Sequence, residues 1–173
     1  MIFLDYFSLP YSGMKDGVHR FDFSVGRDFF REFDNLPVED GDINVRLDVD
    51  KRAQHSILEF DISGTVVTQC DRCLADINLP IYGKQTLHVK VGKGEDDDEV
   101  VFISEDTIRM SVAQYIYEFI CLAMPAIRVY DCASESKPPC DKAVLEKLEV
   151  LESDENDIPS GPLADLFKNG GIA

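Results

Sequence analysis

Two cysteines separated by two residues, Cys70 and Cys73, directly follow a strand-like stretch and constrain the fold of this chain more than any other feature. Two thiols at this spacing can point at one centre from a tight turn, which is half of a tetrahedral metal site. The other half has to come from elsewhere in the chain, and Cys132 and Cys140 are the candidates. If all four sulfurs meet, a turn between strands is tied to the C-terminal part of the chain.

The charge of the chain limits the class of its partners. The 173 residues suit one domain, and a hydrophobic content of 45% is sufficient for an ordinary core. Asp and Glu number 33 against 17 Lys and Arg, so the formal net charge is −16. A chain this acidic repels phosphate backbones, so direct RNA binding is disfavoured, whereas a basic protein is attracted.

The chain is predicted to be cytoplasmic, with no membrane partner. It lacks the uninterrupted run of about 18 apolar residues that a spanning helix requires. Its first residues carry Asp5 and lack the basic start and long apolar centre of a signal peptide. In the cytoplasm the five cysteines are expected to stay reduced, which favours metal ligation, redox chemistry or burial over disulfides.

Alternation of apolar and polar residues predicts a sheet in the first two thirds of the chain. The alternating stretches lie at residues 21–25, 43–49, 58–66 and 87–91, and residues 100–103 are expected to form a short edge strand. Only a short polar link at residues 51–55 separates the second and third stretches, so they are predicted to form a hairpin. The cysteine pair then lies in the turn between two antiparallel strands.

Helical patterns follow the strands. Ser111 and Gln114 have capping-box spacing, the apolar residues from Val112 to Ala123 repeat at helical spacing, and Pro125 ends the run. Asp141 is placed to cap a second helix. We therefore expect an α+β fold, with a mostly antiparallel sheet followed by two helices on one face. Residues 1–151 form this domain, and residues 152–173 form a mobile, acidic, Gly- and Pro-containing tail.

Three interpretations of the cysteines remain open. The first is a structural zinc ion held by Cys70, Cys73, Cys132 and Cys140, a closed site that stabilises the fold without catalysis. The second is a set of reduced, partly buried thiols. The third is reactive thiols, because Cys140 precedes a predicted helix N-terminus and Cys70 and Cys73 have redox spacing.

Three blocks of the sequence stand out, at residues 10–19, at the turn 68–74 and at the helix 115–125. In this order they resemble the YceD family: residues 10–19 resemble the start seen in one bacterial branch, the turn resembles the family's C-x-R-C-L-type turn, and the helix resembles its second block. The family is described as large ribosomal RNA subunit accumulation proteins, and its members have no firmly assigned enzymatic activity. The chain departs from it in having few cysteines in its second half and in carrying residues 158–162 where many members have an Asp-Pro-Arg-type motif.

This resemblance implies a non-enzymatic factor that supports accumulation or maturation of large-subunit ribosomal RNA, with no catalytic residues. Given the charge, it would act through a basic ribosomal protein or an rRNA maturation factor. The alternative is a thiol- or metal-dependent enzyme using Cys70 and Cys73. A third option is direct RNA binding through a patch of basic side chains on or just after one strand, namely Lys84, His88, Lys90 and Lys93.

Overall fold

The computed structural model describes residues 4–33, 38, 40–97, 99–131 and 138–154. It divides into two compact units. The first comprises Met1–Gln69 and Asp76–Arg128, and the second comprises Cys70–Ala75 and Val129–Ala173. The predicted mobile tail at 152–173 stays a prediction, because residues 155–173 lie outside the described part of the chain.

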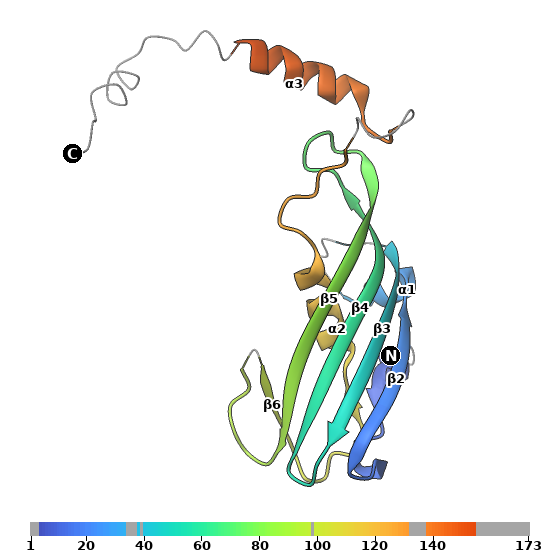
Figure 1. Ribbon diagram of the computed structural model, residues 1–173, viewed down its shortest axis with the longest axis vertical. Coiled ribbons are helices and arrows are strands. Elements are labelled where there is room, and N and C mark those ends of the chain that lie inside the picture. Colours follow the sequence, from blue (N-terminus) through green and yellow to red (C-terminus); the bar gives the residue numbers. More distant parts are fainter. Residues whose placement is uncertain (1–3, 34–37, 39, 98, 132–137, 155–173) are drawn as a thin grey trace, which may run out of the picture. The chain divides into compact units, whose positions relative to one another are not determined.

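The first unit is built on a five-stranded sheet in the order β2-β3-β4-β5-β6 (Figure 1). Neighbouring strands from β2 to β5 are antiparallel, and β6 runs parallel to β5 at the edge. The predicted α+β class and mostly antiparallel sheet are confirmed. The strands are β2 (Gly17–Val25), β3 (Asp40–Lys51), β4 (His55–Gln69), β5 (Asp76–Val91) and β6 (Val100–Ile103).

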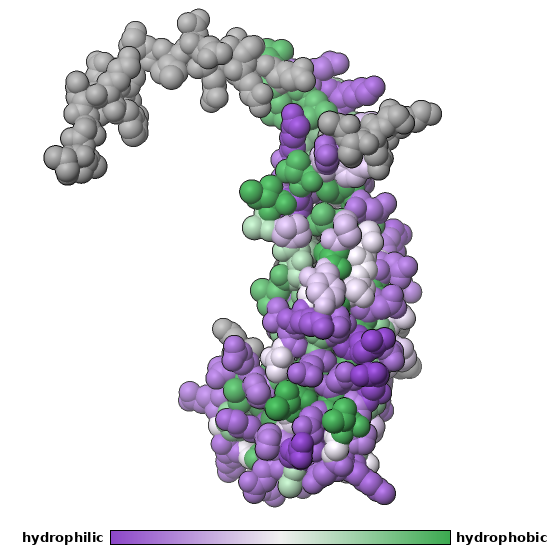
Figure 2. Space-filling model, in the orientation of Figure 1, coloured by the Kyte–Doolittle hydropathy of each residue, from purple (hydrophilic) through white to green (hydrophobic). Residues whose placement is uncertain are grey.

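The alternating sequence pattern becomes two unlike faces of the sheet. On the inner face, Leu47 pairs with Phe60 and Val45 with Ile62, and all four side chains are buried. On the outer face, Arg20 pairs with Asp48 across two strands through an ion pair of 2.6 Å. Figure 2 shows this outer face mostly in purple and white, so only one face of the sheet contributes to the core.

Two helices belong to the first unit. The short α1 (Arg27–Phe30) places Phe29 and Phe30 in the core with no exposed surface. The longer α2 (Ala113–Ala123) packs Phe119 edge-on against Phe60 of β4, with ring centroids 5.0 Å apart. The apolar stripe predicted for α2 therefore covers the inner face of the sheet.

The predicted capping box of α2 is wrong. The helix is preceded by Val112, which makes no side-chain capping bond. Ser111 instead belongs to β7 (Met110–Ser111), which pairs with β1 (Ser8–Leu9) in a separate two-stranded sheet. These strands, and the short 3-10 helices η1 (Leu4–Phe7) and η2 (Tyr11–Gly13), are elements that the sequence patterns did not predict.

The second unit contains α3 (Lys142–Asp154). Asp141 caps it as predicted, because its Oδ1 accepts the backbone N–H groups of Ala143 at 2.9 Å and Val144 at 3.4 Å. Packing of this second helix on the sheet stays a prediction. Among the described residues, no helix is both long enough and apolar enough to cross a membrane.

Candidate metal centre at the cysteine turn

The turn Cys70–Ala75 joins the two longest strands, β4 and β5, as the sequence predicts. Two backbone hydrogen bonds of 2.9 Å close it: Cys70 N–H donates to Ala75 C=O, and Leu74 N–H donates to Cys70 C=O. Leu74 has a φ of 59°, in the left-handed region. A non-glycine residue there costs roughly 1–2 kcal/mol, so the rest of the turn must hold it in place.

The sulfur of Cys70 lies among backbone donors. The N–H groups of Arg72, Cys73 and Tyr130 all point at it, and the Cys73 thiol also hydrogen-bonds to it. Burial raises the pKa of the Cys70 thiol, but these donors together outweigh burial, so the pKa falls below its ordinary value. A ring of N–H groups stabilises negative charge, and the thiolate is the form of cysteine that binds metals.

Access to the two sulfurs is closed. Cys70 and Cys73 each have a relative exposure of 0%. A reactive or catalytic thiol has to meet its substrate, whereas a structural metal ligand is normally enclosed. Complete burial of both sulfurs, together with the lowered pKa of Cys70, therefore fits a structural ligand pair better than a redox or nucleophilic pair.

Cys140, a third predicted ligand, is buried and belongs to the same compact unit, but it is disulfide-bonded. The prediction that all five cysteines stay reduced is therefore wrong for Cys140, whereas Cys70, Cys73 and Cys121 are free. Cys132 lies outside the described residues. Within the described part of the chain, no three His, Cys, Asp or Glu side chains gather closely enough to hold a metal ion. The described residues therefore bring together only two of the predicted ligands, Cys70 and Cys73, and the four-cysteine site stays a prediction.

The fifth cysteine, Cys121, lies on α2 in the other unit. Burial raises the pKa of its thiol. Burial, followed by a hydrogen bond with Cys121, raises the pKa of Tyr117 to about 12. Cys121 is a free thiol of intermediate exposure.

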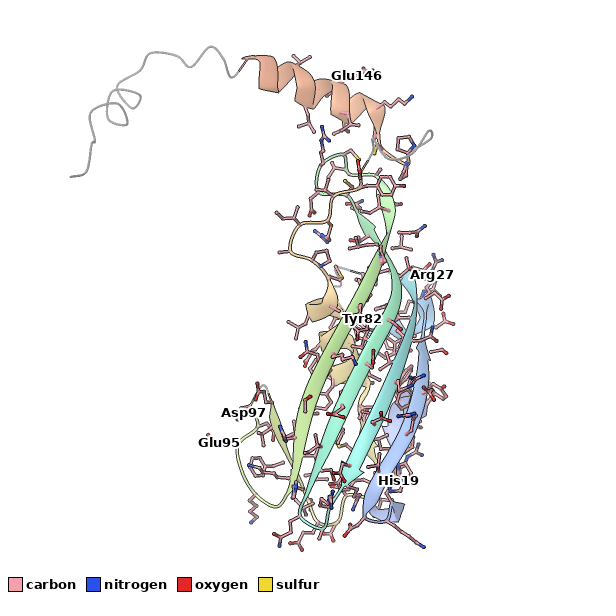
Figure 3. The ribbon with its side chains drawn as sticks, in the orientation of Figure 1. His19, Arg27, Tyr82, Glu95, Asp97 and Glu146 are labelled. Atoms are coloured by element: carbon pink, nitrogen blue, oxygen red, sulfur yellow. The ribbon has the colours of Figure 1, made fainter. Side chains whose placement is uncertain are left out.

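Two basic side chains of the predicted RNA patch already contact other side chains of the same chain. Lys84 forms an ion pair with Asp61 at 3.2 Å, and the Lys90 ammonium lies 5.8 Å from the centroid of the Phe102 ring. The acidic loop after β5 also has a local role, because Asp97 Oδ1 accepts the N–H groups of Glu99 and Val100 at the start of β6. Glu95 and Asp97 are labelled on this loop in Figure 3.

Two features of the turn escaped sequence analysis. The donor from Tyr130 comes from a residue 60 positions away, and only the folded chain brings it to Cys70. The left-handed residue after the second cysteine is a leucine, whereas glycine or asparagine is the usual signal for that conformation. The C-x-x-C spacing alone indicated the turn.

Comparison with known proteins gives one match. A family model described as "Large ribosomal RNA subunit accumulation protein YceD" matches residues 58–167, more than half of the chain. The match begins within β4 and includes the cysteine turn, β5 and α2. No curated protein and no solved structure matches the chain.

Proposed function

The chain belongs to the YceD family of large ribosomal RNA subunit accumulation proteins, and from this membership we propose that it supports the accumulation of large-subunit ribosomal RNA. The observation that carries the proposal is the family match over residues 58–167. This region contains most of β4, all of β5 and the turn between these two longest strands.

The proposed role is non-enzymatic and works through a basic protein partner, either a ribosomal protein or an rRNA maturation factor. A net charge of −16 opposes direct contact with the RNA backbone and favours a partner rich in Lys and Arg. Lys84 pairs with Asp61 and Lys90 lies over the Phe102 ring, and these contacts weaken the case for RNA binding on β5. The enclosed sulfurs of Cys70 and Cys73 weaken the case for a thiol enzyme.

The proposal includes a structural zinc ion. Cys70 and Cys73 would supply two thiolates, and Cys132 and Cys140 the other two once the disulfide of Cys140 is reduced. When bound, zinc would cross-link the turn to the C-terminal segment and would add folding free energy without an open coordination position. The backbone N–H groups around Cys70 would hold its sulfur as a thiolate for that purpose.

The cellular test is depletion of the protein followed by measurement of the ratio of large- to small-subunit ribosomal RNA. We expect a selective fall in the large-subunit RNA that the wild-type chain restores. An unchanged ratio under verified depletion would refute the proposed function.

The zinc test uses the full chain purified under reducing conditions, with bound zinc measured by mass spectrometry. We expect about one zinc per chain, in line with a four-thiolate structural site. Cys70→Ser should lose most of it, whereas the matched control Cys121→Ser, on α2 in the other unit, should retain it. A reduced wild-type chain without zinc, or equal zinc in both variants, would contradict the site.

A further inference from the structure

Strand β5 is paired along only part of the side that faces away from β4. Its partner β6 pairs with residues 88–91, from His88 to Val91, and β4 pairs with the other side of β5 along nearly its whole length. Among the described residues, none hydrogen-bonds to the open side of β5 between Asp76 and Leu87. In Figure 1 this stretch of β5 lies above β6 with no described strand beside it.

The alternation of backbone groups along β5 determines which N–H and C=O groups face its open side. His88 N–H donates to Glu99 C=O next to β6, so the even-numbered residues of β5 direct their N–H groups away from β4. Pro80, which has no N–H, falls on the same row, as expected for proline on an edge strand. Tyr82, Lys84 and Thr86 therefore present free pairing groups, and all three residues are exposed.

Helix α2 runs alongside this stretch. A Cβ on Gly83 would lie 2.9 Å from Ala123 Cβ, so the end of α2 contacts β5 one residue beyond Tyr82. Phe119 contacts Phe60, which pairs with Gln85. The helix is about 16 Å long at 1.5 Å per residue, the same distance as five residue steps along a strand.

One side of α2 is solvent-exposed and carries both an apolar and an acidic group. Leu122 is 67% exposed, and Glu118 lies one helical turn before it, also exposed. The pKa of Tyr115, on the same side one turn earlier, is raised by burial and then by the charges of Asp96 and Glu118. Asp96 belongs to the loop between β5 and β6, so this side of α2 faces the edge of the sheet.

We propose that the open edge of β5 at Tyr82, Lys84 and Thr86, together with the Leu122 side of α2, binds an extended basic segment of a partner protein by strand addition. Backbone pairing with β5 would give affinity, an apolar side chain would cover Leu122, and Lys or Arg side chains would meet Glu118 and Asp96. Figure 2 shows hydrophobic side chains at this margin of the sheet among hydrophilic ones. This inference rests on the proposed function, whose basic partner it gives a binding mode.

A second copy of the chain fits the edge poorly. Two antiparallel β5 strands related by a twofold axis near Lys84 would place like charges opposite each other, which destabilises a cross-strand pair. Each copy would also bring a net charge of −16. A basic segment avoids the repulsion between two acidic chains, and it avoids the first penalty when the residue opposite Lys84 is uncharged.

The test measures binding of a fluorescent ten-residue peptide in which Thr fills every second position and Val and Arg alternate at the other positions, so that both Val and Arg side chains can face α2. Lys84→Pro removes the N–H on the open side and leaves pairing with β4 intact, so the chain should still fold. Its matched control Lys84→Ala removes the same side chain and keeps the N–H. We expect Lys84→Pro to bind at least about tenfold more weakly than Lys84→Ala. The same peptide, N-methylated at alternate residues, should bind the wild type as weakly as the unmodified peptide binds Lys84→Pro.

A second pair of variants tests the helix contact. Leu122→Arg should weaken binding of the basic peptide at least about fivefold, since it removes the apolar contact and adds a like charge. Ile108→Arg is the control, because the exposure of Ile108, 71%, is close to that of Leu122, 67%. Circular dichroism melting confirms that each variant folds.

The outcomes separate this inference from the proposed function. Equal binding by Lys84→Pro and Lys84→Ala, or a wild-type dimer that Lys84→Pro dissociates, overturns strand addition by a partner. If the peptide results hold but depletion leaves the RNA ratio unchanged, the binding edge stands and the proposed function fails. If depletion lowers the ratio and Lys84→Pro restores it as fully as Lys84→Ala, the function stands and the edge inference fails.

Discussion

Gly64, in the middle of β4, is the backbone position most sensitive to a single added carbon. It pairs with Ile43 and has a φ of +158°. A Cβ there would lie 2.6 Å from Ile43 Cα and still closer to the Asp42 carbonyl oxygen. Both neighbours are backbone atoms in a central strand, so they cannot rotate away as a side chain would.

The cost of Gly64→Ala has two parts. The unfavourable φ contributes about 1–2 kcal/mol. Forcing β3 away from β4 contributes about 1–3 kcal/mol, the usual range for overpacking. We expect a total loss of about 2–5 kcal/mol in the free energy of unfolding, which reaches the upper range for a single substitution.

Three other glycines separate the two parts. Gly13 has an ordinary φ and no atom within 4 Å of an added Cβ, so Gly13→Ala should change stability by less than about 0.5 kcal/mol. Gly17 has a φ of +131° in open space, and its alanine variant should show the conformational cost alone. Gly41 has an ordinary φ but would place a Cβ 2.8 Å from the Thr65 carbonyl oxygen, so it reports the steric cost.

The assay is equilibrium urea unfolding of the four alanine variants, followed by circular dichroism. The slope with denaturant should stay constant, so that shifts in the midpoint report stability. We expect the loss for Gly64→Ala to exceed that for Gly17→Ala and that for Gly41→Ala. A loss for Gly64→Ala no larger than that for Gly13→Ala would refute the close contact between β3 and β4 at this position.

Two further predictions concern pH and helix capping. Because the pKa of Tyr117 is raised from 10.0 to about 12, its stabilising effect is fully present below about pH 10 and is lost as the pH rises toward 12. Tyr117→Phe should therefore show a smaller loss of unfolding free energy over that range than the wild type, and an identical pH profile would contradict the raised pKa of Tyr117. Asp141→Ala should lower the stability of α3 by about 1 kcal/mol, seen as faster amide hydrogen exchange in its first turn. Asp141→Asn, which keeps an acceptor oxygen, should retain most of the protection, and equal exchange in the two variants would count against the cap.

The strands could be predicted because burial on one face leaves a mark on the sequence. Residues 43–49 and 58–66 alternate cleanly, and β3 and β4 include both stretches. The prediction for β5 was too short, since the strand begins at Asp76 and the sequence favoured only residues 87–91. Pro80 and Gly83 weaken the local pattern, whereas pairing with β4 keeps the chain extended.

Local capping signals failed where long-range pairing competes with them. Ser111 and Gln114 have the spacing of a capping box. However, Ser111 lies in β7 and pairs with Ser8 of β1, more than a hundred residues away in sequence. Asp141 succeeded because its acceptor oxygen reaches the nearby N–H groups of Ala143 and Val144. The same contrast explains the cysteine turn: its position follows from local spacing, while the Tyr130 donor to Cys70 depends on the fold.

The geometry of β5 separates folding from binding. Its odd-numbered residues pair with β4 through their backbone and supply the buried side chains Ile77, Ile81, Leu87 and Val89. Its even-numbered residues direct both their backbone groups and their exposed side chains away from that core. A partner strand added at Tyr82, Lys84 and Thr86 would therefore displace no backbone pairing among the residues that the structure describes. Binding there would not cost any of the stability that the sheet provides, so an acidic chain could hold and release a basic segment without unfolding.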